Sequence, residues 1–250
     1  MSKTIMVIGA GPGVGLHVAN RFGKEGFRAA LISRTKANLD ACVAKLKENG
    51  VEAEGFQADA GNLKGLASAI EKAQKNFGSI DVLEYSPATD PQLLATPLNI
   101  TVENVRPHME VALGAITAVR AVLPGMIEKG NGGLLFTSAA SAIEPVPFSS
   151  NFAMAQSGIR SYAHSLHRTL KKDGVYAGMM LISGLVDKGD GSLQEPKAPP
   201  PPTPESSMPL ISAYSIAESF WDMYTKRDRI DQIVGDFGLI ERIWAHNTGH

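Results

Sequence analysis

Short apolar runs alternate with longer amphipathic stretches along most of this chain. The apolar runs have the length of buried strands, and they are Thr4 to Ile8, Ala29 to Ser33, Ala53 to Gln57, Asp81 to Tyr85, Gly133 to Thr137, Val175 to Ile182 and Gln232 to Val234. The stretches between them repeat apolar residues at helical spacing, roughly over Gly15 to Glu25, Lys36 to Asn49, Leu63 to Phe77, Thr101 to Glu128, Ser150 to Lys172 and Ser215 to Asp228. This alternation predicts one α/β domain over residues 1–250, a seven-stranded, mainly parallel, doubly wound sheet with helices on both faces. Ligands of such sheets bind beyond the carboxyl ends of the strands.

A glycine-rich loop follows the first predicted strand. It reads Gly9-Ala10-Gly11-Pro12-Gly13-Val14-Gly15 and leads directly into the first predicted helix. In such a loop Gly9 permits a tight turn, Gly13 lets the backbone approach a pyrophosphate, and Gly15 allows the helix to pack closely on the strand. The amides at the start of the helix then face the phosphates. We therefore predict a dinucleotide site here, against the alternative of a purely structural turn.

The overall charge and the cysteine content narrow the range of partners. The chain has 24 basic and 25 acidic residues, so no global field recruits nucleic acid or an anionic membrane surface. The single cysteine, Cys42, excludes an intrachain disulfide and fits a reducing compartment. The apolar run Ile5 to Ile8 is too short for a signal peptide, and no uncharged run approaches membrane-spanning length. We expect a cytoplasmic protein that binds a small molecule, with neither nucleic acid nor a membrane as partner.

The glycine loop and several later landmarks make the chain resemble the nicotinamide-dependent short-chain dehydrogenases, a family with a single-domain Rossmann fold. The later landmarks are Arg120 to Met126, Gly133 to Ser138, Phe152 to Gly158, and Ser183 to Asp187, where the family has Pro-Gly. The resemblance runs over nearly the whole chain. It implies a nicotinamide cofactor held at the glycine loop and at later strand ends, by Gly9, Gly11, Gly13, Val14, Gly15, Ser33, Arg34, Asp59, Ala60, Ser86, Gln156, Gly184 and Val186.

The segment after the second predicted strand bears on which cofactor binds. It reads Ser33-Arg34-Thr35, without the carboxylate that usually contacts the ribose 2′-hydroxyl of NAD. The Arg34 guanidinium, with Ser33 as a hydrogen-bond partner, can instead hold a 2′-phosphate, so NADP(H) is favoured over NAD(H). The alternative is an ordinary loop arginine. Asp59 resembles the family's acid that contacts the adenine amino group, or it caps a helix that starts near Asn62.

The family's catalytic residues are missing from this sequence. Its chemistry depends on a Tyr-x-x-x-Lys pair, and none of the five tyrosines has a lysine four residues later. The resemblance places the family's asparagine, serine, tyrosine and lysine at Val111, Ala139, Phe152 and Gln156. In the family, the tyrosine protonates the oxygen that gains charge during hydride transfer, and the lysine lowers the pKa of that tyrosine. Carbonyl reduction by the usual route is therefore not expected, and no metal site is predicted.

Other side chains could take over part of this role. Ser138 and Ser141 flank Ala139, so one of them could place a hydroxyl near the substrate. Tyr85 ends a strand and could present a phenol, although packing in the core is the alternative. His108 and Glu110 could reach the cleft, or they could belong to a solvated helix face. Arg160 could bind an anionic substrate or point to solvent, and His164 could lie on the surface or at an oligomer contact.

Seven prolines between Glu195 and Pro209 form the one compositional break in the chain. Such a segment favours an extended conformation. In the family the corresponding stretch covers the substrate, so we interpret residues 190–210 as a stiff lid. A disordered loop or a ligand for another protein are the alternatives.

Three functions remain open from the sequence. The first is hydride transfer between NADP(H) and an imine-like or conjugated substrate in a dry cleft lined by Val111, Ala139, Phe152 and Met154, because a cationic electrophile leaves no oxyanion to protonate. The second is an inactive nucleotide-binding sensor or scaffold, and the third is a non-redox isomerase or cyclase. The resemblance also implies a homodimer or homotetramer that associates through the helices Thr101 to Glu128 and Ser150 to Lys172.

Overall fold

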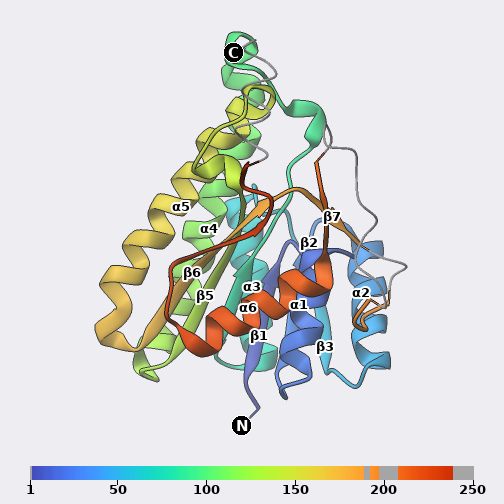
Figure 1. The fold of residues 1–250 in the computed structure, drawn as a ribbon. Coiled ribbons are helices and arrows are strands. Elements are labelled where there is room, and N and C mark those ends of the chain that lie inside the picture. Colours follow the sequence, from blue (N-terminus) through green and yellow to red (C-terminus); the bar gives the residue numbers. More distant parts are fainter. Residues whose placement is uncertain (1, 189–191, 197–207, 239–250) are drawn as a thin grey trace.

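A parallel sheet runs through the centre of the protein (Figure 1). The structure is a computed structural model that describes residues 2–188, 192–196 and 208–238. Within these residues the main sheet has seven strands in the order β3-β2-β1-β4-β5-β6-β9, and every pair is parallel. The strands are β1 (Thr4–Ile8), β2 (Arg28–Ser33), β3 (Ala53–Gln57), β4 (Val82–Tyr85), β5 (Gly132–Ala139), β6 (Val175–Ser183) and β9 (Asp231–Gly235).

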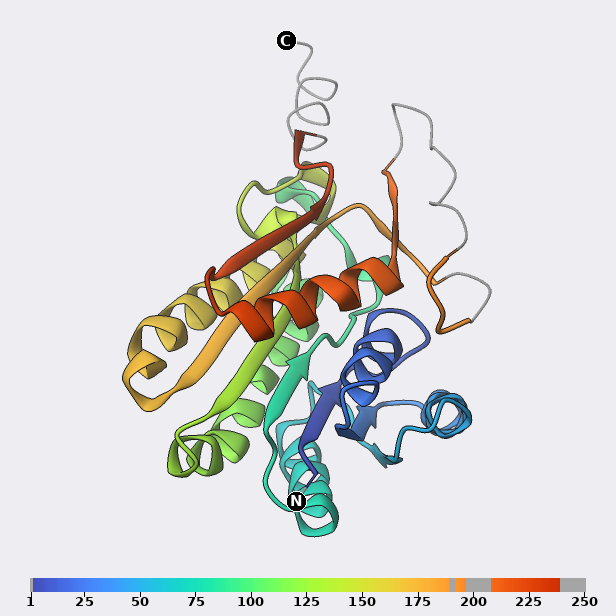
Figure 2. The ribbon, with the colours of Figure 1, turned by 60° about the horizontal axis from the view of Figure 1, so that its bottom comes forward.

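Helices cover both faces of this sheet, as expected for strands joined by right-handed crossovers. One face carries α1 (Val14–Gly23), α2 (Lys36–Glu48) and α6 (Ala213–Lys226), and the other carries α3 (Leu63–Phe77), α4 (Val102–Glu128) and α5 (Ser150–Leu170) (Figures 1 and 2). Successive strand residues point to opposite faces, so each strand contributes to two apolar cores. On β4, for example, Leu83 belongs to the core under α3 and α4, and Val82 belongs to the core under α1 and α6.

The strand register brings the carboxyl ends of the central strands together at one edge. Ile8 at the end of β1 is opposite Ile32 of β2 and Tyr85 of β4, and Tyr85 is opposite Phe136 of β5. The chain order reverses between β1 and β4, because β2 and β3 lie on one side of β1 and β4 to β6 lie on the other. A crevice forms at such a switch point, and this is where open α/β sheets bind ligands.

The predicted doubly wound sheet is confirmed, with each predicted strand and helix present. The main sheet is entirely parallel within the described residues, where the sequence had indicated only a mainly parallel one. A second, two-stranded sheet, which the sequence pattern did not predict, is formed by β7 (Leu185–Asp187) and β8 (Leu210–Ser212). These strands have three residues each, too few for a periodic pattern to stand out. Most of the predicted lid, residues 197–207, lies outside the described residues.

Helix α4 is long and apolar enough to cross a membrane by length and composition, with a mean hydropathy of 1.5 over its most apolar window. It also packs as a covering layer of the sheet. Val111, Ala115, Ala118 and Val122 are buried in the core that α4 shares with α3 and α5. Among the described residues it is the one helix that satisfies this test, and its apolar character is accounted for in part by that burial.

Candidate functional site

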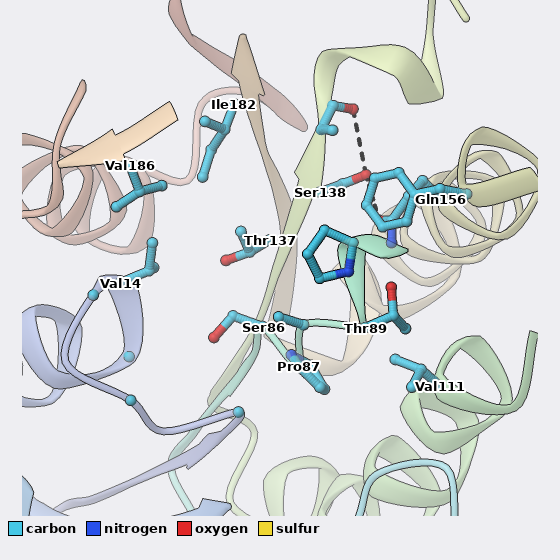
Figure 3. A pocket seen from close by; sticks show the side chains of 18 of the residues that line it. Val14, Ser86, Pro87, Thr89, Val111, Thr137, Ser138, Gln156, Ile182 and Val186 are labelled. Atoms are coloured by element: carbon cyan, nitrogen blue, oxygen red, sulfur yellow. Dashed lines mark hydrogen bonds between the residues drawn. The ribbon is translucent and has the colours of Figure 1, made fainter. Parts of the chain in front are cut away.

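A cleft of about 620 Å³ opens at the carboxyl edge of the sheet. Its volume lies within the range of about 300–1,000 Å³ that is typical of small-molecule and cofactor sites. The loops that follow β1 to β6 line it (Figure 3). The structure places along this cleft all of the residues that the resemblance implied for the cofactor, namely Gly9, Gly11, Gly13, Val14, Gly15, Ser33, Arg34, Asp59, Ala60, Ser86, Gln156, Gly184 and Val186.

Two glycines of the loop lie where a side chain would clash with neighbouring atoms. Gly9 has a φ of +99°, and a Cβ there would lie 2.5 Å from the backbone of Ser86 and Pro87. A Cβ on Gly15 would lie 3.0 Å from Val7 Cγ1, which agrees with the predicted close packing of helix on strand. A Cβ on Gly13 would meet only side-chain atoms of Val186 and Lys188 at 3.7 Å. The glycine at position 13 is therefore not required by the protein's own packing, and it leaves the backbone open to the cleft.

The start of α1 offers free donors to this cleft. Gly13 is the N-cap, no side chain caps the helix, and its first turn carries no acidic residue. The first amides of a helix lack intrahelical acceptors and form the positive end of its dipole. Gly13, Val14 and Gly15 all line the cleft. This arrangement fits the pyrophosphate of a dinucleotide, because an anion would satisfy amides that the protein leaves without a cap.

Arg34 lies at the outer end of the cleft and is exposed. Its Nη2 donates a hydrogen bond to the Ala88 carbonyl over 3.2 Å. Within the described part of the chain, no carboxylate forms an ion pair with it. The guanidinium is thus an uncompensated cation held against the cleft by a single contact.

Asp59 also lines the cleft, and it does not cap α3. Its Oδ1 accepts from the Gly61 amide over 2.9 Å, which closes a local turn. The cap of α3 is Asn62, whose Oδ1 accepts from the Gly65 amide over 3.0 Å. The capping role that was the alternative for Asp59 therefore belongs to Asn62, because α3 begins at Leu63 and Asn62 directly precedes that residue.

At the other end of the cleft, Ser138 and Gln156 form a pair. The Ser138 hydroxyl donates to Gln156 Oε1 over 2.7 Å, and both side chains are buried (Figure 3). Val111, Ala139 and Phe152 line the same end. The position implied for a lysine therefore holds a neutral amide whose oxygen is occupied by a serine. The position implied for the tyrosine holds a phenyl ring.

Ser141 lines the cleft too, but its hydroxyl is buried and has no hydrogen-bond partner among the described residues. Met154, which the sequence analysis placed on the cleft wall, is instead 54% exposed and is not part of the lining. Ser141 therefore faces the cleft as predicted, whereas Met154 does not. The orientation of α5 turns the Met154 side chain away from the cleft, although Phe152 and Gln156 on the same helix line it.

Tyr85 and Arg160 do not serve the cleft. Tyr85 is buried in the core under α4, where its hydroxyl donates to the Val111 carbonyl, and burial raises the pKa of this phenol. Arg160 neither points to solvent nor faces the cleft, because its Nε donates to Asp231 on β9 over 3.1 Å. His164 contacts the same carboxylate over 2.9 Å. These two residues of α5 hold the edge strand instead of a substrate.

His108 is buried instead of lying on a solvated helix face, as one alternative had it. Its side chain lies behind the cleft wall, where Nδ1 shares a hydrogen bond of 2.8 Å with the Thr89 hydroxyl and the ring packs edge-on against Phe152 at 5.6 Å. Burial lowers the pKa of the imidazole, which favours its neutral form. Thr89 itself lines the cleft, so His108 supports a lining hydroxyl without contacting the cavity.

Sequence reasoning missed two polar residues that the structure places beside the site. Asn151 is fully buried, and its Oδ1 accepts from the Ala95 amide over 2.9 Å while its Nδ2 donates to the Leu93 carbonyl over 2.7 Å. It therefore docks the loop before α4 onto the start of α5, directly beside Phe152. No sequence signal marks such a residue, because these two partners lie more than fifty positions away.

The second missed residue is Glu84 on β4, which is fully buried. Its two carboxylate oxygens accept from the hydroxyls of Ser86 and Thr137, each over 2.8 Å. Burial raises the pKa of Glu84 to about 7, against the lowering effect of the two hydrogen bonds. A signal was present in the sequence, because an acid between Leu83 and Tyr85 interrupts an apolar strand that a doubly wound sheet buries on both faces.

Comparisons with known proteins agree with this geometry. The profile of the short chain dehydrogenase family matches residues 3–189. A short-chain dehydrogenase/reductase of Arabidopsis thaliana is 29% identical over 162 residues, which span 64% of this chain and only 61% of that protein. An oxidoreductase of Sarocladium schorii is 30% identical over 175 residues, covering 69% of this chain and 68% of the relative.

Solved structures share the fold at lower sequence identity. L-sorbose reductase from Gluconobacter frateurii, complexed with NADPH and L-sorbose, superposes with a TM-score of 0.80 at 20% identity, covering 96% of this chain and 98% of that one. Acetoin dehydrogenase from Salmonella typhimurium gives a TM-score of 0.83 at 19% identity, covering 96% and 97% of the two chains. Since the family profile spans most of the chain and the sheet, loop and cleft agree with it, this protein belongs to the short chain dehydrogenase family.

Proposed function

We propose that this protein binds NADP(H) and transfers hydride to or from an imine-like or conjugated apolar substrate, without a tyrosine as acid. The observation that carries the proposal is an asymmetry along one cleft. The ionisable lining residues within the described ranges are Arg34, Asp59 and Lys188. Arg34 and Asp59 follow β2 and β3, and Lys188 lies beside Gly13. All three therefore belong to the nucleotide end.

The preference for the phosphorylated cofactor is argued from Arg34. Its guanidinium is exposed, lines the cleft and has no acidic partner among the described residues. A 2′-phosphate would supply the missing counter-charge through hydrogen bonds to the planar guanidinium. A carboxylate at this point, which would favour the plain cofactor, is absent from the sequence Ser33-Arg34-Thr35.

The choice of substrate is argued from the other end of the cleft. Phe152 has no proton to donate, and the Ser138 hydroxyl already donates to Gln156. Reduction of a simple ketone creates an oxyanion, and an acid for it is typically worth about 10²–10⁴-fold in rate. Hydride transfer to an iminium carbon forms a C–H bond and neutralises the positive charge on nitrogen, so no proton is needed. Hydride transfer to the β-carbon of a conjugated enone gives an enolate with delocalised charge, which takes its proton from solvent after it leaves the cleft. The bound nicotinamide supplies the hydride, while this chain's apolar residues exclude water.

Measuring hydride transfer across a matched panel tests the proposal. The purified protein is mixed with NADPH and either cyclic imines, conjugated enones or simple aldehydes, and loss of NADPH absorbance is followed together with product analysis. We expect turnover of at least one imine or enone, with aldehydes slower by about 10²-fold or more. Aldehyde reduction at an equal or higher rate would overturn the substrate assignment. Nucleotide binding with no turnover of any class would instead favour the sensor or scaffold function.

The cofactor preference is measured by binding. Arg34→Ala should weaken NADPH binding but leave NADH binding nearly unchanged, since only the former carries a 2′-phosphate. Lys36→Ala is a matched control, because Lys36 is an exposed neighbour that pairs with Asp40 and does not line the cleft. Equal losses for both nucleotides would contradict the assigned role of Arg34.

A further inference from the structure

Glu84 is a buried carboxyl that the proposed chemistry does not use. It has no exposed surface, and it lies on the central strand β4 between β1 and β5, opposite Val7 and Leu135. An ionised carboxylate is costly to bury without a cation, because the surroundings solvate it far less than water does. Within the described residues its hydrogen bonds come from two neutral hydroxyls, those of Ser86 and Thr137. A buried carboxyl group is therefore energetically unfavourable on this otherwise apolar strand.

Both hydroxyls that hold Glu84 also line the cleft. Figure 3 shows Ser86 and Thr137 between two sets of side chains: Val14, Ile182 and Val186 on one side, and Ser138, Gln156 and Val111 on the other. A dinucleotide that begins at the amides of α1 and ends beside the Ser138–Gln156 pair must pass this point. Glu84 therefore lies directly behind the Ser86 and Thr137 hydroxyls, at the part of the cleft where the nucleotide end meets the substrate end.

The charge on Glu84 is not compensated by its surroundings. The flanking strands β1 and β5 carry no titratable side chain. On the helices that cover this face, Arg21 of α1 pairs with Glu25 and with Glu218 of α6, and His17 contacts the carbonyls of Gly13 and Ser192.

Several acids and phenols of nearby elements also have partners of their own, among them Tyr176 of β6, whose hydroxyl donates to the Arg229 carbonyl over 2.8 Å. On α6, Asp222 pairs with Lys226 and Arg229, and Tyr224 packs against Gly133 and the Arg227 guanidinium. The ionisable residues that share the cleft are Arg34, Asp59 and Lys188. On the far face of the sheet, Tyr85 bonds to Val111, and His108 bonds to Thr89.

We propose that Glu84 discriminates between the oxidised and reduced forms of the bound nicotinamide nucleotide, its carboxylate favouring the oxidised form. This inference rests on the proposed nucleotide binding and adds a residue to it. The oxidised nicotinamide ring is cationic and the reduced ring is neutral, so a buried anion nearby stabilises only the former. Coulombic interactions in such a water-poor site are screened much less than in solution.

The discrimination should depend on pH in the neutral range. Burial raises the pKa of Glu84 to about 7, so the carboxyl is mostly neutral at pH 6 and mostly ionised above pH 8 in the free protein. When Glu84 is ionised, both hydroxyls donate to it. When it is protonated, the acid itself donates to one hydroxyl, which is then free to turn its own proton toward the cleft. By reciprocity, binding of the oxidised nucleotide must release protons near pH 7.

Calorimetric titration of wild type and Glu84→Gln with NADP⁺ and with NADPH, from pH 6 to pH 8.5, tests the inference. The ratio of the two affinities is the quantity of interest, because titration of the 2′-phosphate affects both nucleotides alike. In wild type we expect the ratio to move toward NADP⁺ by about tenfold over this range, ~1.4 kcal/mol. Glu84→Gln should show a flat ratio. The exposed Glu128→Gln on the last turn of α4 is the matched control and should behave as wild type.

Two further measurements keep the outcome decisive if Glu84→Gln folds poorly. Thr137→Val removes one hydrogen bond to the carboxylate and should shift the pH midpoint of the ratio upward. Titrations of wild type in two buffers with different ionisation enthalpies should reveal more proton release with NADP⁺ than with NADPH, because the 2′-phosphate contributes equally to both. A pH-independent ratio in wild type, or an unchanged transition in Glu84→Gln, overturns the role of Glu84 and leaves nucleotide binding intact. If wild type binds neither nucleotide, the proposed function itself fails.

Discussion

The role of a side chain in the cleft depends on the residues that it contacts in the folded protein. Phe152 and Gln156 stand where the family resemblance places an acid and its activating cation, and both line the cleft. Gln156 is tied to Ser138 by a 2.7 Å hydrogen bond, while Phe152 packs against His108. Where the resemblance implies a proton-bearing and a charged side chain, this protein therefore has two neutral and well-packed ones.

Restoring the family's pair should restore its chemistry. In the double variant Phe152→Tyr/Gln156→Lys, a phenol and an ammonium would stand one helical turn apart, and reduction of simple aldehydes should rise by about 10²–10⁴-fold. Steady-state kinetics with NADPH measures this change. The variant with only Gln156→Lys is the control and should gain little, because no proton donor accompanies it. An unchanged aldehyde rate in a folded, nucleotide-binding double variant would show that more than these two residues blocks the usual route.

Glu84 should make stability depend on pH. Its pKa is raised from the ordinary value of 4.5 to about 7 in the folded state, so its contribution is fully present below pH 4.5 and is lost as pH rises through 7. Above pH 8 the buried charge should cost about 3 kcal/mol relative to the neutral acid. Urea unfolding at pH 5.5 and pH 8.5 should show that Glu84→Gln removes this loss and is the more stable protein at pH 8.5. A wild type that gains stability over this interval, with Glu84→Gln unchanged relative to it, would contradict the assignment.

Among the helices and strands, the turn from β1 into α1 is closely packed against its neighbours. Gly9 approaches the chain after β4, and Gly15 approaches β1 itself. The same turn presents uncapped amides to the cleft. One short segment thus joins packing to anion binding, and the two effects can be separated by substitution.

Gly9→Ala and Gly11→Ala form a matched pair for this purpose. Gly9→Ala puts a Cβ 2.5 Å from backbone atoms of Ser86 and Pro87 at a φ of +99°, so it should destabilise the protein by more than about 1 kcal/mol and weaken nucleotide binding. At Gly11 the nearest atom would lie 4.0 Å away, and stability should be retained. Thermal unfolding and nucleotide titration report the two effects. Equal behaviour of both variants would mean that the close approach at Gly9 does not govern this turn.

At the scale of the whole molecule, one apolar face of α4 is partly exposed. Met109, Leu113, Ile116 and Ile127 are each 39–46% exposed. Their successive spacings of four, three and eleven residues place them along one side of the helix. The family resemblance implies association through α4 and α5, and a second copy of this chain is the partner that we propose for this face.

Placing a charge on this face should therefore separate the copies. Leu113→Glu is expected to convert a dimer or tetramer into smaller species in sedimentation velocity runs, because a carboxylate would be buried without a partner. Lys72→Glu on the exposed side of α3 is the control and should leave the assembly unchanged. A wild-type protein that sediments as a monomer at high concentration would refute the proposed association.

The periodic pattern was sufficient for the strands of the main sheet and for the helices that join them, but not for the short strands β7 and β8. A strand or helix leaves its period in its own residues when it is long enough, and the glycine loop was likewise readable from its own residues. The absence of a Tyr-x-x-x-Lys pair is likewise readable from the chain alone. The positions of the Tyr85 and Arg160 side chains could not be predicted from the sequence. Each is fixed by a hydrogen bond to a residue of another element, Val111 for Tyr85 and Asp231 for Arg160.

Tertiary structure alone decided what surrounds the site. The pairing of β4 with β5 brings Thr137 to Glu84 across 53 positions of sequence, and the docking of α5 brings Asn151 to Leu93 across 58. Burial, which raises the pKa of Glu84 and lowers that of His108, exists only once the layers have closed over the sheet. Local periodicity carries no record of such distant pairings, and this is why the cleft's outline was predictable while its polar support was not.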